Sequence, residues 1–223
     1  MISPMSHRSL FAVVFEVKPD PARKDEYLQI AAGLRPVLEK IPGFLENERF
    51  RSSQREGYLL SLSLWDNEKA VVHWRTLEPH HAAQVRGREG VLEDYRIRVG
   101  EVTRVAGRFA DRSVNWMRQD QTEIGQAKAL TIIDGALAEG SSLNPLASTT
   151  HPQALDSDVF QHLNTAERSA FLAGWRTQQD ADNFAEAAIR SNDAGANIYA
   201  IRIVRDYSLK DRREAPTYFP ASK

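Results

Sequence analysis

Cysteine is missing from the sequence altogether. Its absence excludes disulfides, thiolate nucleophiles and cysteine-ligated zinc or iron–sulfur sites, so any catalysis must use other groups. An excess of one charge is missing too, because 29 Lys and Arg stand against 30 Asp and Glu, for a formal net charge of −1. Without a basic field to attract a phosphate backbone, we expect no nucleic-acid partner.

Long apolar runs are also absent. The run from Leu10 to Phe15 is far shorter than the roughly 20 residues that a membrane span needs. The first ten residues contain no apolar segment of the signal-peptide type. We therefore expect a cytoplasmic protein with no membrane partner. The 223 residues, 42% apolar and 26% charged, suit one large folded domain or two small ones.

Two further patterns that would indicate a bound group are not found. No glycine-rich loop follows a predicted strand, so the sequence does not support nucleotide or flavin binding by such a loop. The histidines do not recur with carboxylates at the spacings typical of metal ligands, and we predict no bound metal. The six histidines are His7, His73, His80, His81, His151 and His162.

The first half of the chain alternates strand and helix patterns. Apolar positions from Tyr27 to Ile41 recur every three or four residues, which predicts an amphipathic helix that Pro36 should kink. Pro42 and Gly43 end this helix, and Pro79 predicts a break in a second one. The expected elements are strands over 10–17, 44–51, 58–65 and 95–105, with helices over 27–41, 70–78 and 80–91. This is the ferredoxin-like order βαββαβ.

A weaker second copy begins at Lys128. The segment Phe171 to Trp175 matches Leu60 to Trp65, and the spacing from Trp175 to Phe184 equals that from Trp65 to Trp74. We interpret this as a tandem duplication. The second copy is degenerate, because residues 135–157 are rich in Gly, Ser, Pro and Asn and lack the first helix. The predicted domains are 8–106 and 128–209, with a possibly helical linker over 107–127 and an extended tail over 210–223.

Several motifs of the first copy resemble the antibiotic biosynthesis monooxygenase domain over about ninety residues. These motifs are Phe11–Val17, Leu34-Arg35-Pro36, Ile41-Pro42-Gly43-Phe44, and Leu62-Ser63-Leu64-Trp65 followed by Ala70–Trp74. The resemblance implies a dimeric α/β barrel in which two ferredoxin-like sheets face each other. One chain with two copies would close such an α+β barrel on itself as a monomeric pseudo-dimer; a homodimer is the alternative.

The same resemblance implies chemistry of two kinds. Quinone-forming members oxidise small phenol- or quinol-type aromatics with O2 and no cofactor, using an Asn and, four residues later, a Trp. This chain has Ser61 and Trp65 at those positions. Haem-degrading members use an Asn on the first strand and an axial His ten residues after a helix Trp. Here the helix residue is Trp74, but the tenth position holds Gln84 and the first strand has no Asn.

We therefore predict a cofactor-independent monooxygenase-like enzyme, with its working site in the first copy. Haem binding or degradation, or a non-catalytic ligand-binding or structural pseudo-dimer, are the alternatives. His81 shares the stripe of Trp74 and could take a phenolic proton, although a histidine bonded to backbone is commoner. Arg49 and Arg96 could hold an oxyanion or form salt bridges with nearby glutamates. The predicted catalytic residues are His81, Trp74 and Trp65, and the predicted substrate-binding residues are Ser61, Arg49, Arg96 and Gln84.

Overall fold

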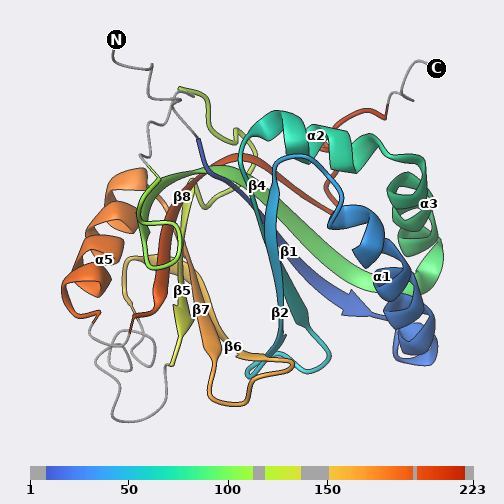
Figure 1. Ribbon diagram of the computed structural model, residues 1–223, viewed down its shortest axis with the longest axis horizontal. Helices are drawn as coiled ribbons and strands as arrows, with labels where there is room; N and C mark the ends of the chain where they lie inside the picture. The colour runs from blue at the N-terminus through green and yellow to red at the C-terminus, as the bar shows by residue number, and fades with distance from the viewer. Residues whose placement is uncertain (1–8, 113–118, 137–150, 193–194, 219–223) are drawn as a thin grey trace.

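The computed structural model describes residues 9–112, 119–136, 151–192 and 195–218. Its strands form a closed barrel in the order β1-β3-β2-β6-β7-β5-β8-β4 (Figure 1). The strands are β1 (Phe11–Pro19), β2 (Phe44–Ser52), β3 (Leu59–Trp65), β4 (Leu92–Ala106), β5 (Ala129–Gly135), β6 (Ala154–His162), β7 (Ser169–Trp175) and β8 (Asn197–Ser208). All neighbouring pairs run antiparallel. The single chain thus closes an α+β barrel, as the sequence predicts.

The two halves of the barrel contain their strands in the same relative order. The first half reads β4-β1-β3-β2 and the second reads β8-β5-β7-β6. The halves meet at two seams of unequal length. The β4–β8 seam runs from Arg96 opposite Ser208 to Ala106 opposite Ile198. The β2–β6 seam pairs Phe50 to Ser52, with one further backbone hydrogen bond on each side, from the Leu163 amide to the Arg49 carbonyl and from the Ser53 amide to the Val159 carbonyl. Closure therefore depends on few backbone bonds at one of the seams.

The barrel lumen is filled by apolar side chains, because strand residues alternate between its inside and its outside. On β1, Ala12 and Val14 point into the lumen, while Phe11 and Val13 face the helices. The larger buried residues of the lumen are Phe50, Leu60, Leu62, Leu64, Leu130, Ile132, Phe160, Leu172, Tyr199, Ile201 and Ile203. This alternation assigns every polar strand residue to one of the two faces.

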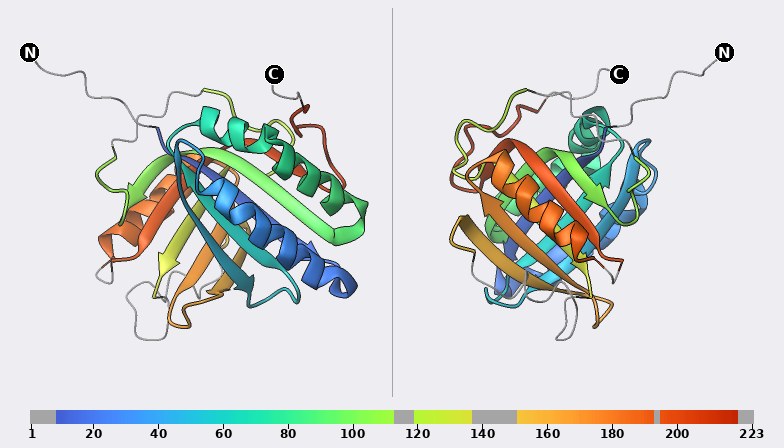
Figure 2. Two further views of the ribbon diagram at one scale, coloured as in Figure 1. Left: turned by 45° about the vertical axis from the view of Figure 1, so that its right-hand side comes forward. Right: turned by 90° about the vertical axis from the view of Figure 1, so that its left-hand side faces the viewer.

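Helices cover the outer faces of the two halves unequally (Figure 2). Helices α1 (Lys24–Leu38), α2 (Glu68–Thr76) and α3 (Glu78–Arg86) lie over the first half, and α5 (Gln178–Arg190) lies over the second. Helix α5 buries Ala181, Phe184, Ala185 and Ala188. In contrast, α1 buries only Ala31 and Leu38, and α3 buries no residue completely. The first half thus has the looser interface between sheet and helices.

Local sequence signals set the helix ends. The Asn67 side chain accepts a 3.0 Å hydrogen bond from the Ala70 amide and caps α2. Gly43, with φ of +90°, makes the turn from α1 to β2; a Cβ there would lie 2.8 Å from the Ala70 Cβ. Leu77 is extended, so α2 ends there and α3 begins one residue before Pro79. The short helices η1 (Pro21–Arg23) and η2 (Gly87–Val91) flank α1 and α3.

Some expected features differ from the structure. Pro36 lies in the last turn of α1, where the helix is about to end, instead of kinking its middle. The expected loop over 135–157 is shorter, because β5 includes Gly135 and β6 already begins at Ala154; residues 137–150 lie outside the described residues. In the linker, 107–112 and 119–127 contain no helix, and 113–118 lie outside the described part.

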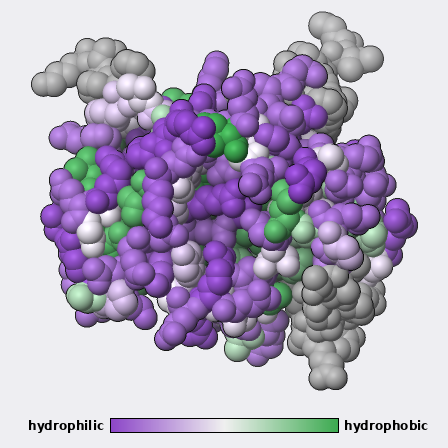
Figure 3. Space-filling view, turned by 180° about the vertical axis from the view of Figure 1, so that it is seen from behind, coloured by the Kyte–Doolittle hydropathy of each residue, from purple (hydrophilic) through white to green (hydrophobic). Residues whose placement is uncertain are grey.

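The surface seen from behind is mainly hydrophilic, with small separate apolar patches (Figure 3). Within the residues that the structure covers, no helix is both long enough and apolar enough to cross a membrane.

Candidate active site

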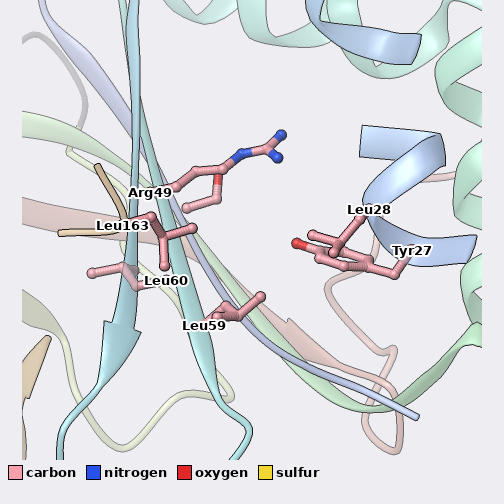
Figure 4. Close-up of a pocket in the computed structure, with 7 residues that line it drawn as sticks. Tyr27, Leu28, Arg49, Leu59, Leu60 and Leu163 are labelled. Carbon is pink, nitrogen blue, oxygen red and sulfur yellow. The ribbon is translucent and has the colours of Figure 1, made fainter. Parts of the chain in front are cut away.

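A cleft lies between helix α1 and the outer face of β2 and β3 (Figure 4). Arg49 pairs with Ser61 in the β2–β3 register, so both side chains emerge on this outer face. The residues that line the cleft are Tyr27, Leu28, Arg49, Leu59, Leu60, Ser61 and Leu163. Its cavity volume of about 10 Å³ holds about one water molecule. A substrate must therefore displace the exposed Leu28 or shift α1 to enter.

Arg49 is the charged group of the cleft. Its side chain extends from β2 toward α1 in Figure 4, and Tyr27 points its hydroxyl back toward the strands. Among the described residues, the Arg49 guanidinium has no hydrogen-bond or ion-pair partner. Burial raises the pKa of Tyr27, and the opposing effect of Arg49 is smaller. The cleft thus combines a cation without a counter-ion, a neutral phenol and several leucines, an arrangement suited to a carboxylate with an apolar body.

Ser61 is held in place by an amide from the neighbouring strand. Asn47 on β2 donates from Nδ2 to the Ser61 Oγ at 2.8 Å and to the Leu62 carbonyl at 3.2 Å. Because Ser61 accepts this bond, its own hydroxyl proton remains available to a substrate oxygen. The resembling family has an asparagine at the position of Ser61. Here an amide lies beside that position, supplied by a different strand.

The two tryptophans predicted for the site differ in their surroundings. Trp65 is 1% exposed, donates from its indole N–H to the Ser63 hydroxyl at 2.9 Å, and packs edge-on against Phe44 with ring centroids 5.3 Å apart. Trp65 is therefore a core residue and does not line the Arg49 cleft. Trp74 is only partly buried and stacks on His80 with the ring centroids 4.1 Å apart.

His80 is the partly buried imidazole of α3 that lies against Trp74. Its Nδ1 lies 3.0 Å from the Trp74 carbonyl; a carbonyl only accepts, so Nδ1 carries the proton and Nε2 is the unprotonated nitrogen. Burial lowers the pKa of His80 to about 4 despite that bond. The amide nitrogen of Gln84 lies 3.3 Å from the same Nδ1 and donates to the Arg75 carbonyl at 3.4 Å.

His81 has a different environment from the one expected. The stripe in the sequence predicts that His81 faces the pocket beside Trp74, but His81 stacks on Tyr218 of the C-terminal segment with ring centroids 3.5 Å apart. The extended Leu77 breaks the helix and changes its phase, so the partner of Trp74 is His80. The sequence predicted a helix break at Pro79, but it did not predict the change of helix phase that the break causes.

Arg96 does not reach the cleft. It lies on the lumen side of β4, where it binds both oxygens of Asp206 at 2.9 and 2.6 Å. Arg96 is opposite Glu16 in the β1–β4 register, and Glu16 shares its strand face with Val14. Strand parity thus places Arg96 on the opposite face of the sheet from the Arg49 cleft, where it forms a salt bridge and does not bind a substrate in that cleft. The structure brings together Arg49 with Ser61, and separately Trp74 with Gln84.

Three residues near the site were missed by sequence reasoning: Tyr27, Asn47 and His80. Asn47 and Arg49 are two residues apart on one strand, so the alternation that singled out Arg49 also places Asn47 on the same face. Tyr27 was identified as a member of the α1 stripe and interpreted as packing.

The residues do not fit a haem ligand set of the resembling kind. The position ten residues after Trp74 is occupied by Gln84, whose amide already binds the Arg75 carbonyl. Both α3 imidazoles are stacked on other rings. Across the described ranges, no group of three or more His, Asp or Glu side chains is placed to hold a metal ion.

Known proteins similar to this chain support a family assignment. A "Jasmonate monooxygenase ABM" of Pyricularia oryzae (strain 70-15) is 36% identical over 221 residues, which are 95% of this chain and 99% of that protein. The protein YqjZ of Bacillus subtilis (strain 168) is 40% identical over 95 residues, 42% of this chain and 80% of that protein.

Among solved structures, an aldoxime dehydratase superposes with a TM-score of 0.58 and 12% identity, covering 95% of this chain and 90% of that one. At this identity the likeness concerns the fold alone. The family profile described as "Antibiotic biosynthesis monooxygenase" matches residues 10–86, the half of the barrel that carries Arg49 and Ser61. With a full-length relative at this identity, the chain belongs to the antibiotic biosynthesis monooxygenase family and is a monooxygenase of that type.

Proposed function

We propose that this monooxygenase oxidises a small, largely apolar carboxylic acid of the jasmonate type at the cleft between α1 and the β2–β3 strands. The observation that carries the proposal is Arg49, a partly buried guanidinium without a counter-ion among the described residues, in a cleft lined by leucines. Jasmonate combines a carboxylate with a cyclopentanone and a hydrocarbon chain. The jasmonate monooxygenase relative spans nearly the whole chain, which supports the same substrate class.

Each residue of the cleft has a role in this proposal. Arg49 binds the substrate carboxylate by charge-assisted hydrogen bonds. Ser61, oriented by Asn47, donates its hydroxyl proton to the substrate carbonyl or phenol oxygen and stabilises the negative charge that forms when the substrate loses a proton. We assign the proton acceptor to the unprotonated Nε2 of His80, beside Trp74. Neither residue lines the closed cleft, so this role requires the same shift of α1 that admits the substrate. The substrate carbanion then adds O2 at carbon, and the hydroperoxide that forms loses water to leave a carbonyl on that carbon, so the substrate itself supplies the electrons that reduce O2 and no added cofactor is needed.

A phenol or quinol, the substrate class expected from the sequence, satisfies only part of this arrangement. Its oxygen could be bound by Ser61, but it would leave the Arg49 guanidinium without a counter-ion. We therefore rank a carboxylate-bearing substrate above a simple phenol.

We also infer that the two halves arose as tandem ferredoxin-like copies with one working site. The equal strand order of the halves supports this inference, as does the equivalent placement of Trp65 and Trp175 at the ends of β3 and β7. The tighter packing of α5 supports a site in the first half only.

The test compares a jasmonate-type acid with its methyl ester in an O2-consumption and product assay. The wild type should favour the acid, and Arg49→Ala should lower kcat/KM for the acid by about 10- to 100-fold while hardly changing turnover of the ester. Arg49→Lys should recover part of the loss. The matched control is Arg51→Ala, which removes an exposed arginine two residues along the same strand.

Two results would contradict the proposal. An equal loss for acid and ester in Arg49→Ala would mean that Arg49 does not bind the carboxylate. Turnover only after haem addition, with a Soret band, would replace the cofactor-independent reaction by a haem-dependent one.

A further inference from the structure

A second cavity lies inside the barrel, on the opposite face of the sheet from the Arg49 cleft. Its volume is about 240 Å³. Arg98 pairs with Val14 in the β1–β4 register, and Asp158 pairs with Leu172 in the β6–β7 register. Val14 and Leu172 belong to the lumen core, so Arg98 and Asp158 project into the lumen from opposite sides. The cavity is lined by Glu16, Arg55, Tyr58, Asp94, Arg96, Arg98, Asp156, Ser157, Asp158 and Leu172.

Arg98 offers donors that no protein group accepts. The residue is 2% exposed, and its Nη2 donates to Glu16. Its Nη1 lies 3.7 Å from the Asp156 Oδ1, beyond hydrogen-bond distance. In the described part of the chain, neither Nε nor Nη1 has a hydrogen-bond partner. Buried guanidinium donors are normally satisfied, so the cavity is suited to a ligand that brings an acceptor, best of all a carboxylate.

Asp158 offers the complementary acceptor. It is 4% exposed, and its Oδ2 accepts hydrogen bonds from the Ser52 hydroxyl at 2.7 Å and from Arg55 Nε at 2.8 Å. Its Oδ1 has no partner among the described residues. A ligand that satisfies both ends must therefore bring a donor to Asp158 and an acceptor to Arg98.

The other charges of the cavity are already paired, which narrows the ligand class. Arg96 binds Asp206 through two nitrogens and lies 3.3 Å from Asp156. Arg55 joins Glu16 to Asp158, and Tyr58 donates to Asp94 at 2.8 Å. Four carboxylates in the lining disfavour a phosphate or another multivalent anion, and three guanidiniums disfavour a metal cation. A ligand with one positive and one negative group adds no net charge.

We propose that this cavity binds a small neutral amino acid as its zwitterion, with the carboxylate on Arg98 and the ammonium group on Asp158. The site is separate from the Arg49 cleft and does not depend on the proposed oxygenation. Leu172 is the apolar side chain of the lining and favours a short aliphatic side chain on the ligand.

The experiment is calorimetric titration of the full chain with glycine, L-alanine and L-serine, and with acetate and methylammonium at equal ionic strength. The amino acids should bind saturably, and the two half-ligands should bind at least about tenfold more weakly, because each satisfies one end only. This comparison needs no variant. Asp158→Asn should weaken glycine binding about tenfold or more, while Asp111→Asn, at an exposed aspartate, should leave it unchanged.

Three outcomes would overturn the proposal. The first is no saturable binding of the amino acids, which would mean that the cavity holds water alone. The second is binding of acetate as tight as that of glycine, which would identify a simple anion site. The third is wild-type glycine binding by Asp158→Asn that is folded by circular dichroism. Because the readout is binding without any substrate present, failure here is distinguishable from failure of the proposed oxygenation.

Discussion

At the scale of single residues, two adjacent histidines have opposite environments. His80 is partly buried by stacking on Trp74, and this burial lowers its pKa to about 4, whereas His81 contacts the C-terminal segment through Tyr218. The unfolded chain binds a proton at His80 with a pKa of about 6.5. Between these two pKa values the unfolded state binds more protons than the folded state, so the folded state loses stability as the pH falls from about 6.5 to about 4.

This difference predicts a specific pH dependence of stability. From pH 7 to pH 5, His80 should lower the free energy of unfolding by about 2 kcal/mol. His80→Asn keeps a donor for the Trp74 carbonyl but cannot titrate. The free energy of unfolding of the variant should therefore fall by about 2 kcal/mol less than that of the wild type over the same interval. The measurement is urea unfolding at both pH values, with His81→Asn as the matched control. Parallel pH curves for wild type and His80→Asn would show that burial does not suppress protonation of this ring.

At the scale of secondary-structure elements, the helices differ in how firmly they are held. Helix α5 buries Phe184 among Phe171 and Trp175, with ring centroids 5.7 and 5.0 Å apart. Helix α3 buries no residue completely and starts without a side-chain cap. Since most helical stability in proteins comes from packing of an apolar face, α3 should open far more readily than α5. This loose helix packs against α1, the helix that must move before a substrate enters the narrow cleft.

The difference between the helices can be measured by hydrogen exchange. Amides of residues 78–86 should exchange at least about tenfold faster than those of residues 178–190 at neutral pH, because local opening of α3 exposes little apolar surface. A substrate acid bound at Arg49 should slow exchange in 24–38 and leave 178–190 unchanged. Equal protection of α3 and α5 in the free protein would contradict this account of how the cleft opens.

The elements also show what a sequence pattern can and cannot determine. Alternation and helical spacing correctly predicted the strands, the Pro42-Gly43 turn and a break near Pro79, because these depend on local backbone preferences. The outer face of Ser61 and Arg49 followed from the same alternation. The phase of α3 could not be predicted in this way, because it depends on the dihedral angles of Leu77. The face on which Arg96 lies could not be predicted either, because nothing local distinguishes the lumen face of β4 from its helix face.

At the scale of the whole molecule, the short seam between β2 and β6 is reinforced by side chains. Arg168, just before β7, binds both oxygens of Asp134 on β5 at 2.7 and 2.5 Å and reaches Glu48 on β2 at 2.9 Å. Glu48 also accepts from His162 on β6 at 3.0 Å. Burial raises the pKa of Glu48, but the hydrogen bonds from His162 and Arg168 outweigh this effect and lower it. The network links the two halves where their backbone pairing is short, from Arg49 to Ser53.

Removal of Arg168 should therefore destabilise the closed barrel much more than loss of a surface ion pair. Asp134 is 1% exposed, and without Arg168 its side chain keeps, among the described residues, only the hydrogen bond from the Asn197 amide at 3.4 Å. Arg168→Met should lower the free energy of unfolding by about 3 kcal/mol, because it leaves a buried carboxylate without its counter-ion. Adding Asp134→Asn should recover part of the loss by removing that charge.

The control is Arg213→Met, which removes an exposed ion pair with Asp211 and should lower the free energy of unfolding by less than about 1 kcal/mol. Urea unfolding measures all four proteins. If Arg168→Met unfolds at the same urea concentration as the control, the seam is held by backbone pairing and lumen packing alone.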